Sequence, residues 1–168
     1  MLYSAQMTKA IFPGSFDPPT NGHMNIIERA SRLFDSIDVV IANNVSKSYL
    51  FSSDERLGML RELTSPFKNV TVHVCEKLIV EYARENGANI LIRGIRNTID
   101  FSYEFDLALM NRNLDSSIET VFIPTDQRYI TFKSSAIKEL ASFGGDVSEM
   151  VPECVKRMID IKSKSVIR

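Results

Sequence analysis

The chain has 168 residues, enough for one well-buried domain, and 44% of them are hydrophobic and 24% charged, as in ordinary globular proteins. A formal net charge of −1, and no run near the roughly 18 apolar residues of a membrane span, exclude nucleic acid and membranes as partners, so any phosphate site must be local. We therefore expect a single cytoplasmic domain over residues 1–168, with residues 1–7 as a short N-terminal leader.

Five short apolar runs rich in Ile, Val or Phe predict strands. They span residues 9–12, 37–42, 70–75, 89–92 and 118–123. Apolar residues recur every three or four positions between the runs, which predicts helices with one apolar face, and two more helices are expected near 134–143 and 152–162. Strict alternation of strand and helix predicts an α/β fold: one Rossmann-like, doubly wound domain with a five-stranded parallel sheet in the order 3-2-1-4-5 and helices on both faces.

Local signals at helix ends agree with these elements. Ser52 stands three residues before Glu55, the spacing of a capping box at a helix start. Gly87 and Gly144 stand where two of the predicted helices should stop.

The cysteines and histidines do not form a metal-binding pattern. Cys75 and Cys154 are far apart and belong to no CxxC motif, so we expect reduced cysteines that serve packing. The only histidines are His23 and His73, and His73 falls within a predicted strand, where packing is the expected role. The sequence therefore predicts no metal site made by protein side chains.

Special backbone residues gather at one edge of the predicted sheet. Three of the seven glycines, Gly14, Gly22 and Gly94, follow the first or fourth strand, and most prolines follow the first or fifth. In a doubly wound sheet, ligands bind at the carboxyl ends of the strands, where the strand order reverses. With the order 3-2-1-4-5, that point lies between the first and fourth strands, which predicts the site there.

The turn after the first strand, residues 12–23, has the composition of an anion site. Gly14 and Gly22 allow close approach of backbone to a ligand, and Ser15 offers a hydroxyl. His23 falls in the first turn of the next helix, beside its free N–H groups. The alternative is an ordinary proline-rich turn with a solvated histidine.

This turn carries a family resemblance. Residues 14–23 read GSFDPPTNGH, which resembles the G-[ST]-F-D-P-x-T-x-G-H signature of the phosphopantetheine adenylyltransferases, in the HxGH nucleotidyltransferase superfamily. Thr20 stands where the related nicotinate mononucleotide adenylyltransferases typically carry His. Residues 92–96 (IRGIR), 100–104 (DFSYE) and 110–112 (MNR) resemble further motifs of the same family in the same order.

The resemblance implies a reaction. It implies transfer of AMP from ATP to 4′-phosphopantetheine, giving dephospho-coenzyme A and pyrophosphate, a step of coenzyme A synthesis. It further implies Mg²⁺ accompanying ATP, a homohexamer built as a dimer of trimers, and coenzyme A as a candidate inhibitor. No covalent carrier such as a cysteine nucleophile or a Ser-His-Asp set is evident, so direct attack by the acceptor phosphate is expected.

The resemblance also implies residue roles. His23, Lys47 and Arg93 fall at the catalytic positions, where they would stabilise the transferring α-phosphate and hold the acceptor phosphate. The phosphopantetheine-binding positions are Ser15, Lys47, Ile79 and Arg93. The ATP-binding positions are Ser15, Phe16, His23, Gly94, Ile95, Arg96, Glu104, Tyr129, Ile130, Thr131, Phe132, Lys133, Ser134 and Ser135.

Some of these residues have plainer alternatives. Arg93 and Arg96 would bring bidentate donors to the phosphate turn, but they could instead form surface pairs with Asp100 or Glu104. Lone loop lysines such as Lys47 are usually just solvated.

The serine segment before the helix near 134–143 departs from the family pattern. Lys133 replaces the first of three serines, which adds a cation near the phosphates. Ser134 and Ser135 would present hydroxyls and amides to the triphosphate, although Ser134 could simply cap the helix.

Two other functions fit the same fold. One is an adenylyl- or cytidylyltransferase for a different phosphate acceptor, which Thr20 disfavours. The other is a nucleotide sensor that binds ATP without turnover, which the intact His23 disfavours.

Overall fold

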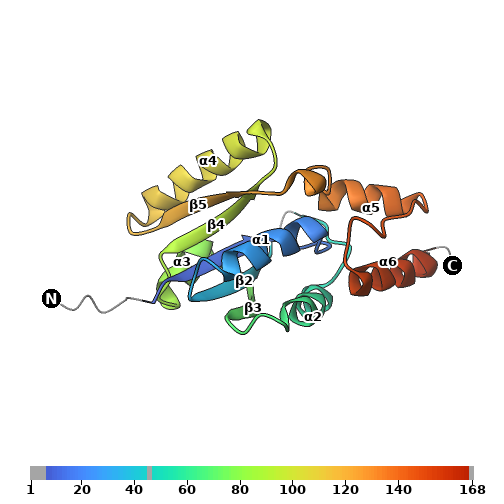
Figure 1. The fold of residues 1–168 in the computed structure, drawn as a ribbon, viewed down its shortest axis with the longest axis horizontal. Helices are drawn as coiled ribbons and strands as arrows, with labels where there is room; N and C mark the ends of the chain where they lie inside the picture. Colours follow the sequence, from blue (N-terminus) through green and yellow to red (C-terminus); the bar gives the residue numbers. More distant parts are fainter. Residues whose placement is uncertain (1–6, 45–46, 167–168) are drawn as a thin grey trace.

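The computed structural model describes residues 7–44 and 47–166 and shows one five-stranded sheet (Figure 1). All strands are parallel and lie in the order β3-β2-β1-β4-β5, which confirms the predicted fold class and strand order. Residues 1–6, most of the expected leader, lie outside the described residues, and the extent of the domain stays a prediction. The strands are β1 Lys9–Gly14, β2 Ser36–Ala42, β3 Val70–Cys75, β4 Ile90–Ile95 and β5 Glu119–Pro124.

Helices alternate with the strands and then close the chain. They are α1 Asn21–Ser31, α2 Ser53–Thr64, α3 Ile79–Glu85, α4 Thr98–Leu114, the short 3-10 turn η1 Gln127–Tyr129, α5 Ser134–Ser142 and α6 Glu153–Val166. The two C-terminal helices lie side by side beyond the sheet (Figure 1). Within the described part of the chain, no helix combines the length and apolarity that crossing a membrane requires.

The sheet buries both of its faces. Along β1, Ala10 and Phe12 belong to one core cluster together with residues of α1 and α2, while Ile11 belongs to a second cluster together with residues of α3. Side chains alternate across a strand, so neighbouring positions reach opposite faces. A strand buried on both sides reads as a continuous apolar run, which is why the strands were readable from the sequence.

A third core cluster lies beyond the carboxyl ends of the strands. It joins Phe51, just before α2, to Ile137 of α5 and Val155 of α6, each of which is 1% exposed or less. A backbone hydrogen bond of 3.0 Å from Asn21 N to Met150 O also attaches the start of α1 to the segment before α6. The start of α5 is thereby fixed beside the ends of the strands.

The predicted helix ends are present. Ser52 Oγ accepts from Glu55 N at 3.2 Å and Glu55 Oε2 accepts from Ser52 N at 2.8 Å, so the capping box is confirmed. Gly87 and Gly144 have φ of 66° and 74°, the left-handed conformation that favours glycine after a helix. Cys75 and Cys154 are free and buried, as predicted.

Candidate active site

A cleft of about 450 Å³ opens at the carboxyl ends of β1 and β4, the strands at which the strand order reverses. Its walls come from the β1–α1 loop, the segment between β2 and α2, the end of β4, and the stretch from η1 into α5. This is the edge at which the glycine and proline pattern predicted a site.

Most of the predicted site residues meet in this cleft. Ile95, Ile130 and Thr131 do not line it, and Ile79 packs against the second core cluster on the α3 face, so the structure does not bring these four to the cleft. The predicted residues that line it are Ser15, Phe16, His23, Lys47, Arg93, Gly94, Arg96, Glu104, Tyr129, Phe132, Lys133, Ser134 and Ser135.

A capping box at the start of α1 fixes the ring of His23. Thr20 N donates to His23 Nδ1 at 3.0 Å, and His23 N donates to Thr20 Oγ1 at 3.2 Å, so histidine takes the place that Glu or Gln usually has in this motif. Because Nδ1 accepts from a backbone amide, the neutral ring carries its proton on Nε2. Nε2–H is therefore the ring donor left for a ligand in the cleft.

The surroundings of His23 keep the ring neutral. Burial and, second, the positive charge of Arg96 lower the pKa of His23 from 6.5 to about 4. The ring packs against Phe12 and Phe16, whose ring centroids lie 6.5 and 5.0 Å from its own. At neutral pH, His23 therefore acts as a hydrogen-bond donor without a charge.

Gly14 serves the packing of this aromatic group. A Cβ at Gly14 would come within 2.9 Å of the Phe16 ring, so only glycine lets Phe16 fold back onto β1. Phe16 adopts a left-handed φ of 49°, uncommon for a bulky residue, and its burial to 1% exposure offsets the strain. The space beside Gly14 thus holds a side chain, whereas the sequence suggested close approach of backbone to a ligand.

Two arginines from the end of β4 are held by carboxylates of α4. Arg93 Nη2 donates to Glu104 Oε1 at 2.8 Å and its Nη1 donates to the Pro13 carbonyl at 3.1 Å. Arg96 Nε donates to Asp100 Oδ2 at 2.6 Å. The pairs considered as an alternative from the sequence therefore exist, yet both arginines remain on the wall of the cleft. A guanidinium has five N–H donors, so pairing orients each arginine and leaves donors for an anion.

The start of α5 presents first-turn amides to the cleft without a side-chain cap. Lys133 is the N-cap residue and forms no side-chain capping hydrogen bond. Ser134 does not cap the helix either, because its Oγ donates to the Pro18 carbonyl at 2.9 Å. The first-turn N–H groups and the positive end of the helix dipole are thus available to a phosphate.

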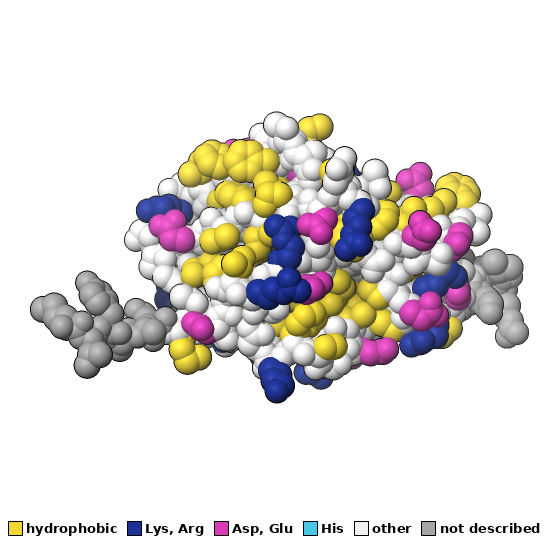
Figure 2. Space-filling view, in the orientation of Figure 1, with side chains coloured by type: hydrophobic (Ala, Val, Ile, Leu, Met, Phe, Trp, Pro, Cys, Tyr) yellow, Lys and Arg dark blue, Asp and Glu magenta, His cyan; other side chains and the backbone are white. Residues whose placement is uncertain are grey.

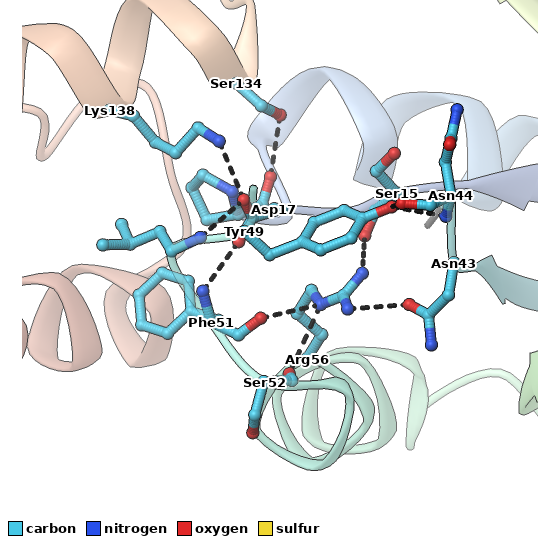
Figure 3. Close-up of polar contacts among 12 residues, drawn as sticks. Ser15, Asp17, Asn43, Asn44, Tyr49, Phe51, Ser52, Arg56, Ser134 and Lys138 are labelled. Atoms are coloured by element: carbon cyan, nitrogen blue, oxygen red, sulfur yellow. Dashed lines mark hydrogen bonds and ion pairs between the residues drawn. The ribbon is translucent and has the colours of Figure 1, made fainter. Parts of the chain in front are cut away.

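Sequence reasoning missed a buried carboxylate that joins three segments of the site (Figure 3). Asp17 is 3% exposed and accepts from the backbone amides of Leu50 and Phe51, both at 2.9 Å, and from Lys138 Nζ at 2.8 Å. Lys138 also lines the cleft. The signal for Lys138 was its spacing, since it follows Ser134 by four residues and shares its face of α5.

The charges in the cleft suit an anion. Its five basic side chains outnumber its two carboxylates, although the whole chain has a net charge of −1. The described residues hold no group of three or more His, Cys, Asp or Glu side chains arranged for a metal ion. The two carboxylates are already engaged, Asp17 by Lys138 and Glu104 by Arg93. These donors fit phosphate oxygens, and a divalent cation would be carried by those oxygens and water.

Most of the chain matches a known protein family. Residues 11–140 match the family model described as cytidylyltransferase-like. Proteins named phosphopantetheine adenylyltransferase are similar over most of their length. The one from Desulfatibacillum aliphaticivorans is 50% identical over 155 residues, covering 92% of this chain and 89% of its own. The one from Alkaliphilus metalliredigens is 45% identical over 157 residues, covering 94% of this chain and 100% of its own.

Solved structures share the fold at much lower identity. A structure provisionally assigned as a nicotinate-nucleotide adenylyltransferase from Vibrio parahaemolyticus superposes with a TM-score of 0.69 at 18% identity, covering 94% of each chain. A lipopolysaccharide core biosynthesis protein from Thermoplasma volcanium superposes with a TM-score of 0.53 at 20% identity, covering 72% of this chain and 98% of its own. At these identities the likeness establishes the fold alone.

Proposed function

We infer the reaction from the family: the chain belongs to the phosphopantetheine adenylyltransferases, among the cytidylyltransferase-like proteins. It transfers AMP from ATP to 4′-phosphopantetheine and gives dephospho-coenzyme A and pyrophosphate, a step of coenzyme A synthesis. The observation that carries this function beyond family membership is the cleft itself, where a neutral histidine donor, an uncapped helix start and an excess of basic side chains converge.

The chemistry needs positioning more than proton transfer. The acceptor phosphate is largely ionised near neutral pH, so it attacks the α-phosphorus without a general base, while the bond to the leaving pyrophosphate breaks. The barrier lies mainly in bringing two polyanions together in line. His23 Nε2–H would donate to a non-bridging oxygen of the α-phosphate as charge builds there.

The remaining groups divide between the two substrates. Lys47 and Arg93 would hold the acceptor phosphate, and the donors of Arg96 with the first-turn amides of α5 would receive the β- and γ-phosphates. Lys138 would join them if its pair with Asp17 opened toward the ligand. Mg²⁺ enters as part of the Mg-ATP substrate.

The test is release of pyrophosphate from Mg-ATP that depends on phosphopantetheine. Nicotinate mononucleotide with ATP, and glycerol 3-phosphate with CTP, serve as parallel acceptors. Release of pyrophosphate with phosphopantetheine, and with neither of the other two acceptors, supports the proposal. Release only with another acceptor would keep the chemistry and discard the substrate, and ATP binding with no release in any arm would indicate a nucleotide sensor.

Assembly is a second part of the proposal. No residue of α4 is buried, and Phe105, Leu109 and Met110 on this helix are 45 to 59% exposed. Figure 2 shows hydrophobic side chains gathered over α4. Apolar surface of this extent is typical of an interface, and we propose that other copies of the chain cover it in a homohexamer. Sedimentation should give the hexamer for the natural chain and smaller species for Leu109→Lys.

Two further expectations follow from the reaction. Because the reaction is a step of coenzyme A synthesis, we expect the protein in the cytoplasm, which cell fractionation tests. Coenzyme A contains the product's own dephospho-coenzyme A portion, so it is the candidate inhibitor, and competition against phosphopantetheine tests it.

A further inference from the structure

Arg56, in the first turn of α2, is the largest fully buried side chain among the described residues, at 1% exposure, and the reaction steps above do not use it. Its Nη1 donates to the Ser15 carbonyl and its Nη2 to Asn43 Oδ1, both at 2.8 Å. Its Nε donates to the Phe51 carbonyl at 3.1 Å. Each hydrogen bond described for this guanidinium thus goes to an uncharged oxygen.

An arginine is a costly way to fill this space. Removing a guanidinium from water is unfavourable, and carbonyl dipoles offset the loss less completely than a carboxylate would. An apolar side chain of similar volume would pack α2 at lower cost. The guanidinium supplies something else, a rigid planar fork that can hold three points of the chain in one geometry.

These three points lie on two connections that both contribute residues to the cleft wall, and Figure 3 shows them around the Arg56 side chain. Ser15 lies in the β1–α1 loop, Asn43 follows β2, and Phe51 precedes α2. The Arg56 guanidinium also stacks on Tyr49, 4.2 Å from the ring centroid. Ser15 and Tyr49 line the cleft together with Lys47, which stands in the chain between Asn43 and Tyr49.

Asp17 holds the same stretch from the other side. The amide of Phe51 donates to Asp17 Oδ1 while its carbonyl accepts from Arg56 Nε, so this residue is held between a buried anion and a buried cation. Charge-assisted hydrogen bonds of this kind are shorter and stronger than neutral ones. Residues 47–51, the segment that carries Lys47, are thereby fixed at their C-terminal end, at Phe51.

We propose that Arg56 is a positioning residue, which holds Ser15 and the Lys47 segment in the arrangement that places the acceptor phosphate in line with the α-phosphorus. This inference rests on the proposed function. The hydrogen bonds described for Arg56 reach none of the triphosphate-side groups on α1, β4 and α5. Among the groups that Arg56 holds, only Ser15 is also expected to bind ATP, so loss of Arg56 should affect the acceptor much more than the nucleotide.

Arg56→Lys tests the role, because it keeps the charge and most of the stem but loses the fork. We expect kcat/KM for phosphopantetheine to fall about tenfold or more, since small misplacements of reacting groups are costly, while the Kd of ATP measured by calorimetry changes less than about twofold. Arg61→Lys is the matched control, the same substitution at an exposed position of the same helix, and should change neither value.

A general loss of stability must be separated from positioning. Leu60→Ala removes a fully buried side chain of α2 and should lower the melting temperature without dividing the two substrates. Equal losses for ATP and phosphopantetheine in Arg56→Lys, matching Leu60→Ala at equal stability, would overturn the proposal.

Hydrogen exchange gives a readout that needs no turnover. In the protein without substrates, Arg56→Lys should speed exchange of amides in residues 47–53 and leave those of α5 unchanged. Unchanged exchange in residues 47–53 would overturn the positioning role, whereas absence of turnover by the natural chain would overturn only the proposed function.

Discussion

Charged side chains gather at both ends of the strands, and the two groups are built differently. At the carboxyl ends, five basic and two acidic side chains surround an open cleft. Towards the amino ends, Asp38 is 2% exposed and pairs with Lys9 at 2.7 Å, while Thr71 Oγ1 and Tyr82 OH donate to it at 2.8 and 3.2 Å. We call these four residues the amino-end cluster.

The difference lies in balance and access. In the amino-end cluster, one anion is neutralised by one cation and two hydroxyl donors, and none of the four residues lines the cleft. Burial and, second, the charge of Asp38 raise the pKa of Tyr82, so its hydroxyl stays a donor. In the cleft, positive charge is in excess and faces a cavity. Balanced buried charge serves the fold, whereas unbalanced charge beside a cavity serves a ligand.

The largest expected effect is at His23. His23→Ala should lower kcat about 100- to 1,000-fold, because the variant loses a donor to the developing charge on the α-phosphate. The Kd of ATP should change far less, since this contact strengthens in the transition state. Calorimetry for ATP beside steady-state kinetics measures both quantities. Equal losses in binding and turnover would contradict a transition-state role.

A change in the amino-end cluster should lower stability and leave catalysis unchanged. Asp38→Asn leaves Lys9 without its anion and should lower the free energy of unfolding by about 3 kcal/mol, with kcat and KM unchanged. Urea titration measures the stability. Asp35→Asn, the same substitution at an exposed residue nearby, should cost much less. A change in KM for Asp38→Asn would show that the two ends of the sheet are coupled.

Sequence reasoning found the elements whose signals are local. The strands, the Ser52 capping box and the edge that bears the site all follow from short-range patterns. The contacts of Arg56 and Asp17 are long-range. Arg56 and Ser15 are 41 positions apart in the sequence, and Asp17 and Lys138 are 121 positions apart. No periodicity or spacing predicts such pairs, because they form only when the β1–α1 loop meets helices α2 and α5 at the end of the sheet.

The capping box formed by Thr20 and His23 could not be predicted from the sequence either. Thr20 followed three residues later by His23 is not the usual Ser or Thr with Glu or Gln, so the sequence located the residue but not its tautomer. Ile79 is a case in which the sequence predicted more than the structure supports. The family resemblance assigned it to the substrate, but it packs on the α3 face and gives no sign of that role.

The neutral His23 should make stability depend on pH. Its pKa of about 4 in the folded protein lies below 6.5, so between these values the unfolded chain binds a proton that the folded chain refuses. Stability is therefore lost as pH falls through this window, by about 2 kcal/mol at pH 5 relative to pH 8. Urea titrations at both pH values measure this. His23→Ala isolates the contribution, and an equal pH dependence in the variant would refute it.

The smallest expected effect concerns Lys133, the exposed N-cap of α5. Lys133→Ser should raise the KM of ATP about threefold, because an exposed charge contributes little, and the effect should shrink as salt is raised. The same change should stabilise the fold by about 1 kcal/mol, since serine caps a helix well and lysine does not. Kinetics at two ionic strengths and thermal melting measure the two quantities.

Lys133→Met separates the two contributions, because it removes the charge without supplying a cap. It should reproduce the change in KM and leave the melting temperature near that of the natural chain. Opposite signs for ATP affinity and stability in Lys133→Ser would mean that the cleft keeps a charge at the expense of a better helix start, which the balanced amino-end cluster has no reason to do. A rise in stability with unchanged KM would instead place Lys133 outside the phosphate site.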